Sequence, residues 1–146
     1  MGESKNSVNE SEPQTPQDLE AAVRDRILAR DSRYALGAYL FLYEALAFTQ
    51  KKFSRDDPNL NQEERHVSGQ ELLEGIRDYA AQAFGPLAPT VFRNWGLSSG
   101  QDFGEIVFNL VENDLLRKTD QDRREDFAEG FDFDTAFDGP VEVKPQ

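Results

Sequence analysis

The chain of 146 residues contains no cysteine and a single histidine, His66. Without cysteine it has no disulfide, no cysteine-ligated zinc site and no thiol nucleophile. A single histidine also excludes a two-histidine metal site within one chain. His66 stands directly before a predicted helix start, where packing against a loop is a more common role than acid–base chemistry. We therefore expect no common catalytic machinery and no enzymatic activity.

Positive charge and long apolar segments are also scarce. Sixteen Lys and Arg against 28 Asp and Glu give a formal net charge of −12. A surface with this balance repels nucleic acid and anionic membranes. No segment approaches the roughly 18 consecutive apolar residues of a membrane helix, and the first residues lack the apolar region of a signal peptide. The sequence predicts a cytoplasmic protein that does not associate with membranes.

The acidic residues near the C-terminus do not match a metal-binding motif. Asp132, Asp134 and Asp138 resemble part of a calcium loop, which needs an oxygen ligand at its fifth position and glycine at its sixth. This chain has Ala136 and Phe137 at those positions. It also has no glycine-rich phosphate-binding motif. We expect no metal and no cofactor.

The composition divides the chain into three parts. Residues 1–14 are polar and are expected to be a disordered N-terminal tail. Residues 15–137 are predicted to form a single globular domain, and residues 138–146 a flexible C-terminal tail.

Thr15 and Pro16 provide a capping hydroxyl and a first-turn proline, which predict a helix start. The segment 34–53 is apolar on every side of a helix drawn through it, which is typical of a buried helix.

A central block, residues 66–119, contains the clearest helix signals. Ser68 and Glu71 have capping-box spacing, and Gly85 followed by Pro86 predicts the end of that helix. A short helix is expected over residues 88–95, closed by Gly96. Ser99 then caps a third helix, whose apolar residues recur at helical spacing as one buried stripe: Phe103, Ile106, Val107, Leu110 and Val111.

Two short strands are predicted after these helices. Residues 115–119 form the first, residues 120–126 a charged turn, and residues 127–133 the second. Three helices followed by a hairpin is the order of a winged helix. The predicted fold is therefore mainly α with a small β-hairpin (α+β): a winged-helix-like three-helix core with additional N-terminal helices. The alternative is a plain helical bundle with an irregular tail.

The third helix argues against binding to DNA, although winged helices often read DNA with it. Between Ser99 and Asp114 the chain has four acids and no Lys or Arg. Each acid near the duplex would oppose the release of counterions that supplies most of the binding free energy. A winged-helix nucleic-acid-binding regulator therefore remains the alternative rather than the leading function.

The leading prediction is a non-enzymatic module that binds another protein. Basic residues on the predicted hairpin and phenylalanines in an acidic tail are the candidate contacts, since aromatic anchors with a charged rim are common at interfaces. They are Arg117, Lys118, Phe127, Phe131, Phe133 and Phe137. Alternatively, the phenylalanines complete the core of the domain. A pocket that gathered Glu44, His66 and Arg77 would instead favour an enzyme.

Long blocks of the chain resemble a family of small bacterial proteins with no assigned activity. The blocks include HVSGQELLEGIR and DFGEIVFNLVENDLLRKT, and the resemblance covers about residues 30–137. Ala35 is a departure, because relatives often have proline after the preceding Arg-Tyr pair. The resemblance implies a bacterial cytosolic protein and transfers no substrate, cofactor or catalytic residue.

Overall fold

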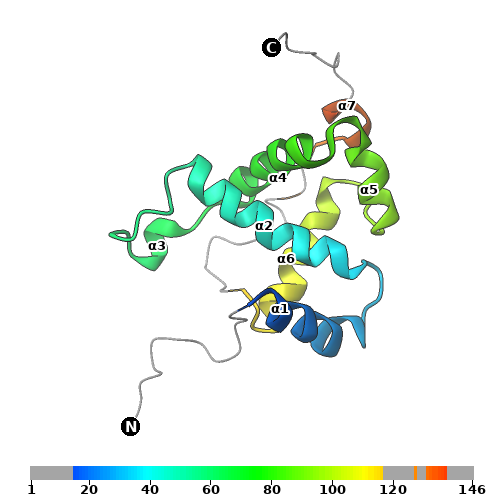
Figure 1. Ribbon diagram of the computed structural model, residues 1–146, viewed down its shortest axis with the longest axis horizontal. Helices are drawn as coiled ribbons and strands as arrows, with labels where there is room; N and C mark the ends of the chain where they lie inside the picture. The colour runs from blue at the N-terminus through cyan, green and yellow to red at the C-terminus, as the bar shows by residue number, and fades with distance from the viewer. Residues whose placement is uncertain (1–14, 117–126, 128–130, 138–146) are drawn as a thin grey trace.

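The computed structural model describes residues 15–116, 127 and 131–137, and these residues are mainly helical (Figure 1). The elements in chain order are α1 (Pro16–Ala22), the π-helical turn η2 (Val23–Leu28), α2 (Leu36–Lys52), α3 (Gln62–Arg65), α4 (Gly69–Phe84), the 3₁₀ turn η3 (Gly85–Leu87), α5 (Ala88–Asn94), α6 (Gly100–Glu112) and α7 (Phe133–Ala136). The predicted tails, residues 1–14 and 138–146, lie outside the described residues.

Helix α2 lies at the centre of the fold. It packs against α4 along its length and against α1 and α6 on its other sides (Figure 1). Ala38, Tyr39, Leu42 and Ala45 on α2 are fully buried. The structure confirms the prediction of a helix in this segment, and the long apolar surface explains why the other helices gather around it.

The helix starts follow the predicted capping chemistry. The Thr15 hydroxyl accepts the N–H of Asp18 at 3.0 Å. At α4 the Ser68 hydroxyl accepts the N–H of Glu71 at 3.1 Å, and the Glu71 carboxylate accepts the N–H of Ser68 at 2.9 Å. The capping box is therefore confirmed. Arg55 adds a two-pronged ion pair to Glu71 at 2.9 and 2.8 Å, which fixes the loop before α4 to this helix start.

Helices α2 and α4 approach most closely where Gly75 faces Thr49. A Cβ at Gly75 would overlap the Thr49 hydroxyl oxygen and lie 2.7 Å from the Thr49 Cβ. Thr49 is fully buried, and its hydroxyl donates to the Ala45 carbonyl at 2.7 Å, so its polar group is satisfied inside its own helix. The glycine thus allows two helix backbones to pack around one small polar side chain.

The predicted β-hairpin is wrong: no strand occurs in residues 15–116 or 131–137. Leu115 and Leu116, predicted to begin a strand, belong to the C-terminal cap of α6. The Leu115 N–H donates to the Leu110 carbonyl at 2.8 Å and the Asp114 N–H donates to the Val111 carbonyl at 3.1 Å, with Asp114 at φ 62°. This is the Schellman motif, in which the chain turns back after a left-handed residue. Residues 117–126 lie outside the described residues.

The second predicted strand is also corrected, because Phe133 begins the helical turn α7. Phe131 and Phe133 alternate with acids as in a strand, yet the Ala136 N–H donates to the Asp132 carbonyl at 2.8 Å and closes a helical turn over Phe133–Ala136. Without a wing, the winged-helix assignment fails. The mainly α part of the prediction is correct, and the described residues form a helical fold around α2.

The turn before α2 depends on the end of α5. The Ala35 N–H donates to the Trp95 carbonyl at 3.0 Å. Gly96, at φ 95°, packs its Cα against the Arg33 carbonyl, where a Cβ could not fit. Proline at position 35 would remove the Ala35 donor and with it the hydrogen bond that holds this turn.

Replacing Gly75 with alanine is expected to destabilise the fold by about 2–3 kcal/mol, because the new methyl group overlaps Thr49. Adding Thr49→Ala should recover part of this loss, since it removes the hydroxyl but leaves the nearby Cβ. Urea unfolding of both single variants and the double variant measures the coupling. Strictly additive free energies would contradict the close contact.

Replacing Asp114 with glycine is expected to stabilise the protein by about 0.5–1 kcal/mol, because glycine adopts the left-handed conformation without a steric penalty. Glu112→Gly, two residues earlier and still in helical conformation, should instead destabilise it by about 1 kcal/mol. Thermal unfolding of the two variants distinguishes them. A loss of stability in Asp114→Gly would show that α6 does not end in this cap.

Candidate functional site

The phenylalanines predicted to contact a partner lie largely inside the protein. Phe127 and Phe133 are 3% and 1% exposed. Phe131 and Phe137 are half-buried, with ring centroids 6.5 Å from Phe103 and 5.9 Å from Phe92 respectively. The core alternative therefore accounts for Phe127 and Phe133. Arg117 and Lys118 lie outside the described residues.

Helix α6, compared above with a DNA-reading helix, uses its polar side chains within the fold. Asp102 accepts the Tyr34 hydroxyl at 2.6 Å and the N–H of Ser98 at 2.7 Å. The Asn109 amide donates to the buried Tyr39 hydroxyl at 2.9 Å and to Asp31 at 3.3 Å. These contacts tie α6 to α2 and the preceding loop. Asp102 and Asn109 are thus used for internal hydrogen bonding, whereas Glu112 and Asp114 are exposed.

Asp31 and Arg33 form the most strongly perturbed charged pair near this network. Arg33 donates to the two Asp31 carboxylate oxygens at 3.0 and 2.8 Å. The hydrogen bonds from the Arg33 side chain and backbone lower the pKa of Asp31 from its ordinary 3.8 to about 2. Burial, followed by the bond to Asp102, raises the pKa of Tyr34. Each shift follows from a structural contact, so the cluster explains the loop geometry and suggests no chemistry.

Glu44, His66 and Arg77, the trio that would have favoured an enzyme, make separate contacts. Glu44 accepts the Tyr79 hydroxyl at 3.0 Å, and the Arg77 guanidinium lies 3.5 Å from its neighbour Asp78. His66 ends the short helix α3, and its carbonyl accepts Arg55 at 2.7 Å. Within the described residues, no group of three or more His, Asp or Glu is placed to hold a metal ion.

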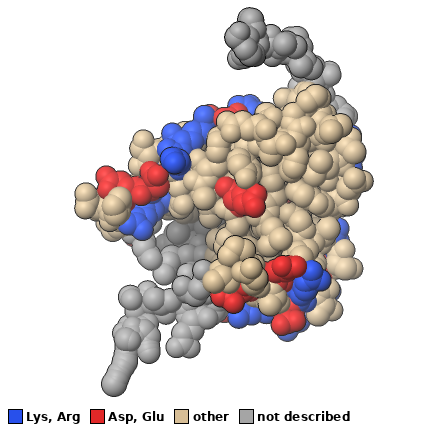
Figure 2. Space-filling model, in the orientation of Figure 1, with Lys and Arg blue, Asp and Glu red and all other residues tan. Residues whose placement is uncertain are grey.

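A broad uncharged face is the most distinctive surface of the protein. Charged residues make up 30% of the chain, yet residues 36–50 contain one, Glu44, and residues 79–92 contain none. The first segment lies in α2; the second covers the end of α4, η3 and most of α5. Because α2 packs against α4, the two segments lie side by side. Figure 2 shows the result: a wide area without charge, with a single acidic group at its centre.

Half-buried aromatic rings fill the junction between these segments. We call Phe48, Tyr79, Phe84 and Trp95 the aromatic seam. The Phe48 and Tyr79 ring centroids are 5.3 Å apart, and those of Phe84 and Trp95 are 5.9 Å apart. Buried Phe41 lies beneath, 5.5 Å from Tyr79, 5.7 Å from Phe84 and 5.6 Å from Trp95. The seam therefore rests on a rigid aromatic layer and presents the outer edges of its rings to solvent.

Small and exposed apolar residues extend the seam. Ala47 lies one turn after Glu44 on α2, and Ala83 lies one turn after Tyr79 on α4; both are exposed. Leu87 in η3 is 65% exposed, the one large hydrophobic side chain so exposed among the described residues. A Cβ at Gly37 would lie 2.5 Å from the Trp95 Nε1 and 2.8 Å from its Cε2, so the indole sits directly on the α2 backbone.

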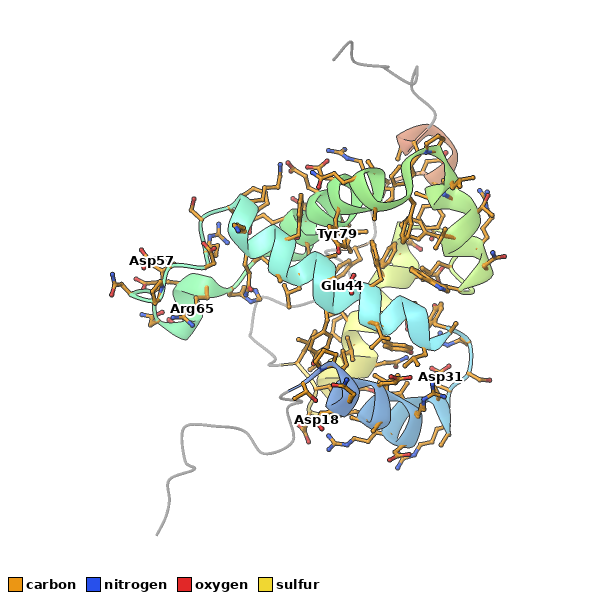
Figure 3. The ribbon with its side chains drawn as sticks, viewed as in Figure 1. Asp18, Asp31, Glu44, Asp57, Arg65 and Tyr79 are labelled. Atoms are coloured by element: carbon orange, nitrogen blue, oxygen red, sulfur yellow. The ribbon has the colours of Figure 1, made fainter. Side chains whose placement is uncertain are left out.

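Glu44 is the centre of this face. Figure 3 shows Glu44 and Tyr79 close together where α2 passes α4. The Tyr79 hydroxyl, whose pKa is raised first by burial and then by its hydrogen bond to Glu44, holds the carboxylate in place. No Lys or Arg pairs with Glu44 in the part of the chain that the structure describes. Lys52, at the C-terminal end of α2, instead pairs with Glu74 and Asp78 at 3.5 and 3.0 Å.

Sequence reasoning missed this face, although its signal was present. The segment 34–53 predicts a buried helix because apolar residues occur on every side of it, but Glu44 and Ala47 are exposed. A second uncharged stretch at residues 79–92 could have indicated a shared surface. Only the packing of α2 against α4 places the two stretches together.

Comparisons with known proteins found no family model, curated protein or solved structure that matches this chain. The resemblance to a bacterial family therefore stays a prediction. Across the described residues, none of the helices has the length and apolar character needed to cross a bilayer.

Replacing Asp31 with asparagine is expected to make the free energy of unfolding depend less on pH between pH 2 and 4. Because the folded-state pKa of Asp31 lies below its unfolded value, the carboxylate stabilises the fold above about pH 4, and this contribution disappears as the pH falls towards 2. A shift of this size corresponds to about 2 kcal/mol, reduced to about 1 kcal/mol by solvent around the half-exposed Arg33. Urea unfolding between pH 2 and 5 measures it. If the free energy of unfolding depends on pH as steeply in the variant as in the wild-type chain, the Asp31 carboxylate does not stabilise the fold.

Proposed function

We propose that this protein is a non-enzymatic binding module, which recognises another protein through the uncharged face formed by α2, α4, η3 and α5. One observation carries the proposal: two nearly charge-free segments, in a chain rich in charge, are placed side by side and partly exposed. An isolated exposed apolar residue is ordinary, whereas a cluster of partly exposed ones, here the aromatic seam with Leu87, is typical of an interaction site.

The composition of the face supports a protein as the partner. Aromatic residues are enriched at the centres of protein interfaces, and charged residues are depleted there. The aromatic seam supplies rigid rings that are already packed, so binding costs little side-chain entropy at these positions. Charged residues lie at its edge, where Lys52 pairs with Glu74 and Asp78. Hot-spot residues usually have this arrangement: aromatic side chains at the centre of the interface, surrounded by a polar rim.

The remaining parts of the proposal come from the composition. A net charge of −12 disfavours nucleic acid and anionic lipid as partners. The cytoplasm is proposed as the location. The other predicted partner contacts stay part of the proposal, as an extension of the uncharged face. They are Arg117, Lys118 and the half-buried Phe131 and Phe137.

Two exposed alanines allow a direct test. Ala47→Glu and Ala83→Glu each place a carboxylate beside the Glu44–Tyr79 pair and should reduce retention of the partner by about tenfold or more, since a buried unpaired charge costs more than the roughly 1.4 kcal/mol that this factor represents. Quantitative mass spectrometry of proteins retained from native lysate by each immobilised variant measures the loss.

Ala81→Glu is the matched control. Ala81 belongs to residues 79–92 and is exposed, but it is two residues from both Tyr79 and Ala83, which places it on nearly the opposite side of α4, away from the Glu44–Tyr79 pair. It should retain the partner as the wild-type chain does, and circular dichroism should show all three variants folded. If the three variants retain the same proteins in equal amounts, the uncharged face is not the binding surface.

A further inference from the structure

Glu44 is the one charged residue in segments 36–50 and 79–92, which form the described part of the uncharged face, and a hydrogen bond fixes its position. Its carboxylate accepts the Tyr79 hydroxyl at 3.0 Å, and the side chains that surround it on α2 and α4 carry no charge. A carboxylate offers about four acceptor positions, of which Tyr79 fills one. Water satisfies the others while the face is open. A partner that covers the face must replace that water.

We propose that Glu44 selects the partner: a protein segment that places a Lys or Arg side chain against the Glu44 carboxylate, with apolar side chains packed on either side over the aromatic seam. This inference rests on the proposed function and specifies the chemistry of its partner. Arginine fits best, because its planar group can donate two parallel hydrogen bonds to one carboxylate.

Charge complementarity requires the cation. Covering Glu44 with purely apolar side chains would leave a buried charge with one hydrogen bond, which costs several kcal/mol. No Lys or Arg of the described residues pairs with Glu44 to neutralise it. We therefore assign the compensating charge to the partner. The overall charge of −12 acts in the same direction, since it attracts basic segments from a distance.

The same carboxylate disfavours other occupants of the face. In a symmetric dimer through this face, each Glu44 would be covered by the uncharged side chains of the other copy or by the other Glu44, and neither supplies a cation. Nucleic acid and anionic lipid would bring phosphate to a carboxylate. A central acid thus protects the aromatic seam from self-association while it leaves the seam open to a cationic segment.

The test uses random 12-residue peptides displayed on phage and the full chain as the immobilised target. The wild-type chain should enrich peptides in which Lys or Arg is flanked by aromatic or aliphatic residues. Glu44→Lys should enrich peptides with Asp or Glu at that place, and its affinity for the wild-type peptides should fall by about 100-fold, as expected for opposed like charges in an interface.

Glu112→Lys is the matched control, because it makes the same charge change at an exposed position on α6. It should enrich the same peptides as the wild-type chain, with unchanged affinity. The inference is overturned if Glu44→Lys binds the wild-type peptides equally well, if the enriched peptides lack a basic residue, or if nothing is enriched on the wild-type chain over Glu44→Lys.

Two further readouts separate this inference from the proposed function. If Ala47→Glu and Ala83→Glu lose a lysate partner that Glu44→Lys still retains, the face binds a protein but Glu44 does not select it. If sedimentation equilibrium shows a wild-type dimer that Ala47→Glu dissociates, a second copy occupies the face and the cationic segment is excluded. A monomeric wild-type chain supports the inference.

Discussion

The contact between Gly75 and Thr49 sets how closely α2 and α4 approach, and the rest of the structure depends on that distance. A larger residue at position 75 would overlap the Thr49 hydroxyl, which is itself satisfied by Ala45. With the two helices this close, the rings of Phe41, Phe48 and Tyr79 can touch across the junction. The packing of α4 against α2 therefore determines which residues of α2 are buried and which, such as Glu44 and Ala47, stay exposed.

This packing also links the core to the candidate site. Phe41 is buried beneath the aromatic seam, and the same ring lies 5.7 Å from Phe92, which in turn lies 4.9 Å from Phe133. A continuous layer of rings thus runs from the exposed seam to the C-terminal phenylalanines. Such a layer gives a binding surface rigidity, because its side chains cannot change rotamer without disturbing the core.

Local features could be predicted from the sequence because their causes are local. The Ser68 capping box and the apolar helix around Tyr39 follow from spacing and side-chain chemistry alone. The end of α6 could not be predicted in this way. Its cap uses Asp114 in a left-handed conformation that usually indicates glycine, so Leu115 resembled the start of a strand.

The candidate site was hidden for a different reason. A helix that is apolar on every side predicts burial, and the sequence does not specify which strip of that helix its neighbours leave uncovered. Glu44 was visible in the sequence, but its significance depends on residues 79–92, which only the folded chain places beside it. Sequence patterns give the faces of single helices, whereas a site built from two helices depends on how they pack.

Hydrogen–deuterium exchange of the full chain, alone and with the partner that the wild-type chain retains, tests the central claim most directly. Slower exchange confined to residues 36–50 and 79–92 is the result expected if the uncharged face is the binding surface. Slower exchange in α1 and α6, with these two segments unchanged, would contradict it.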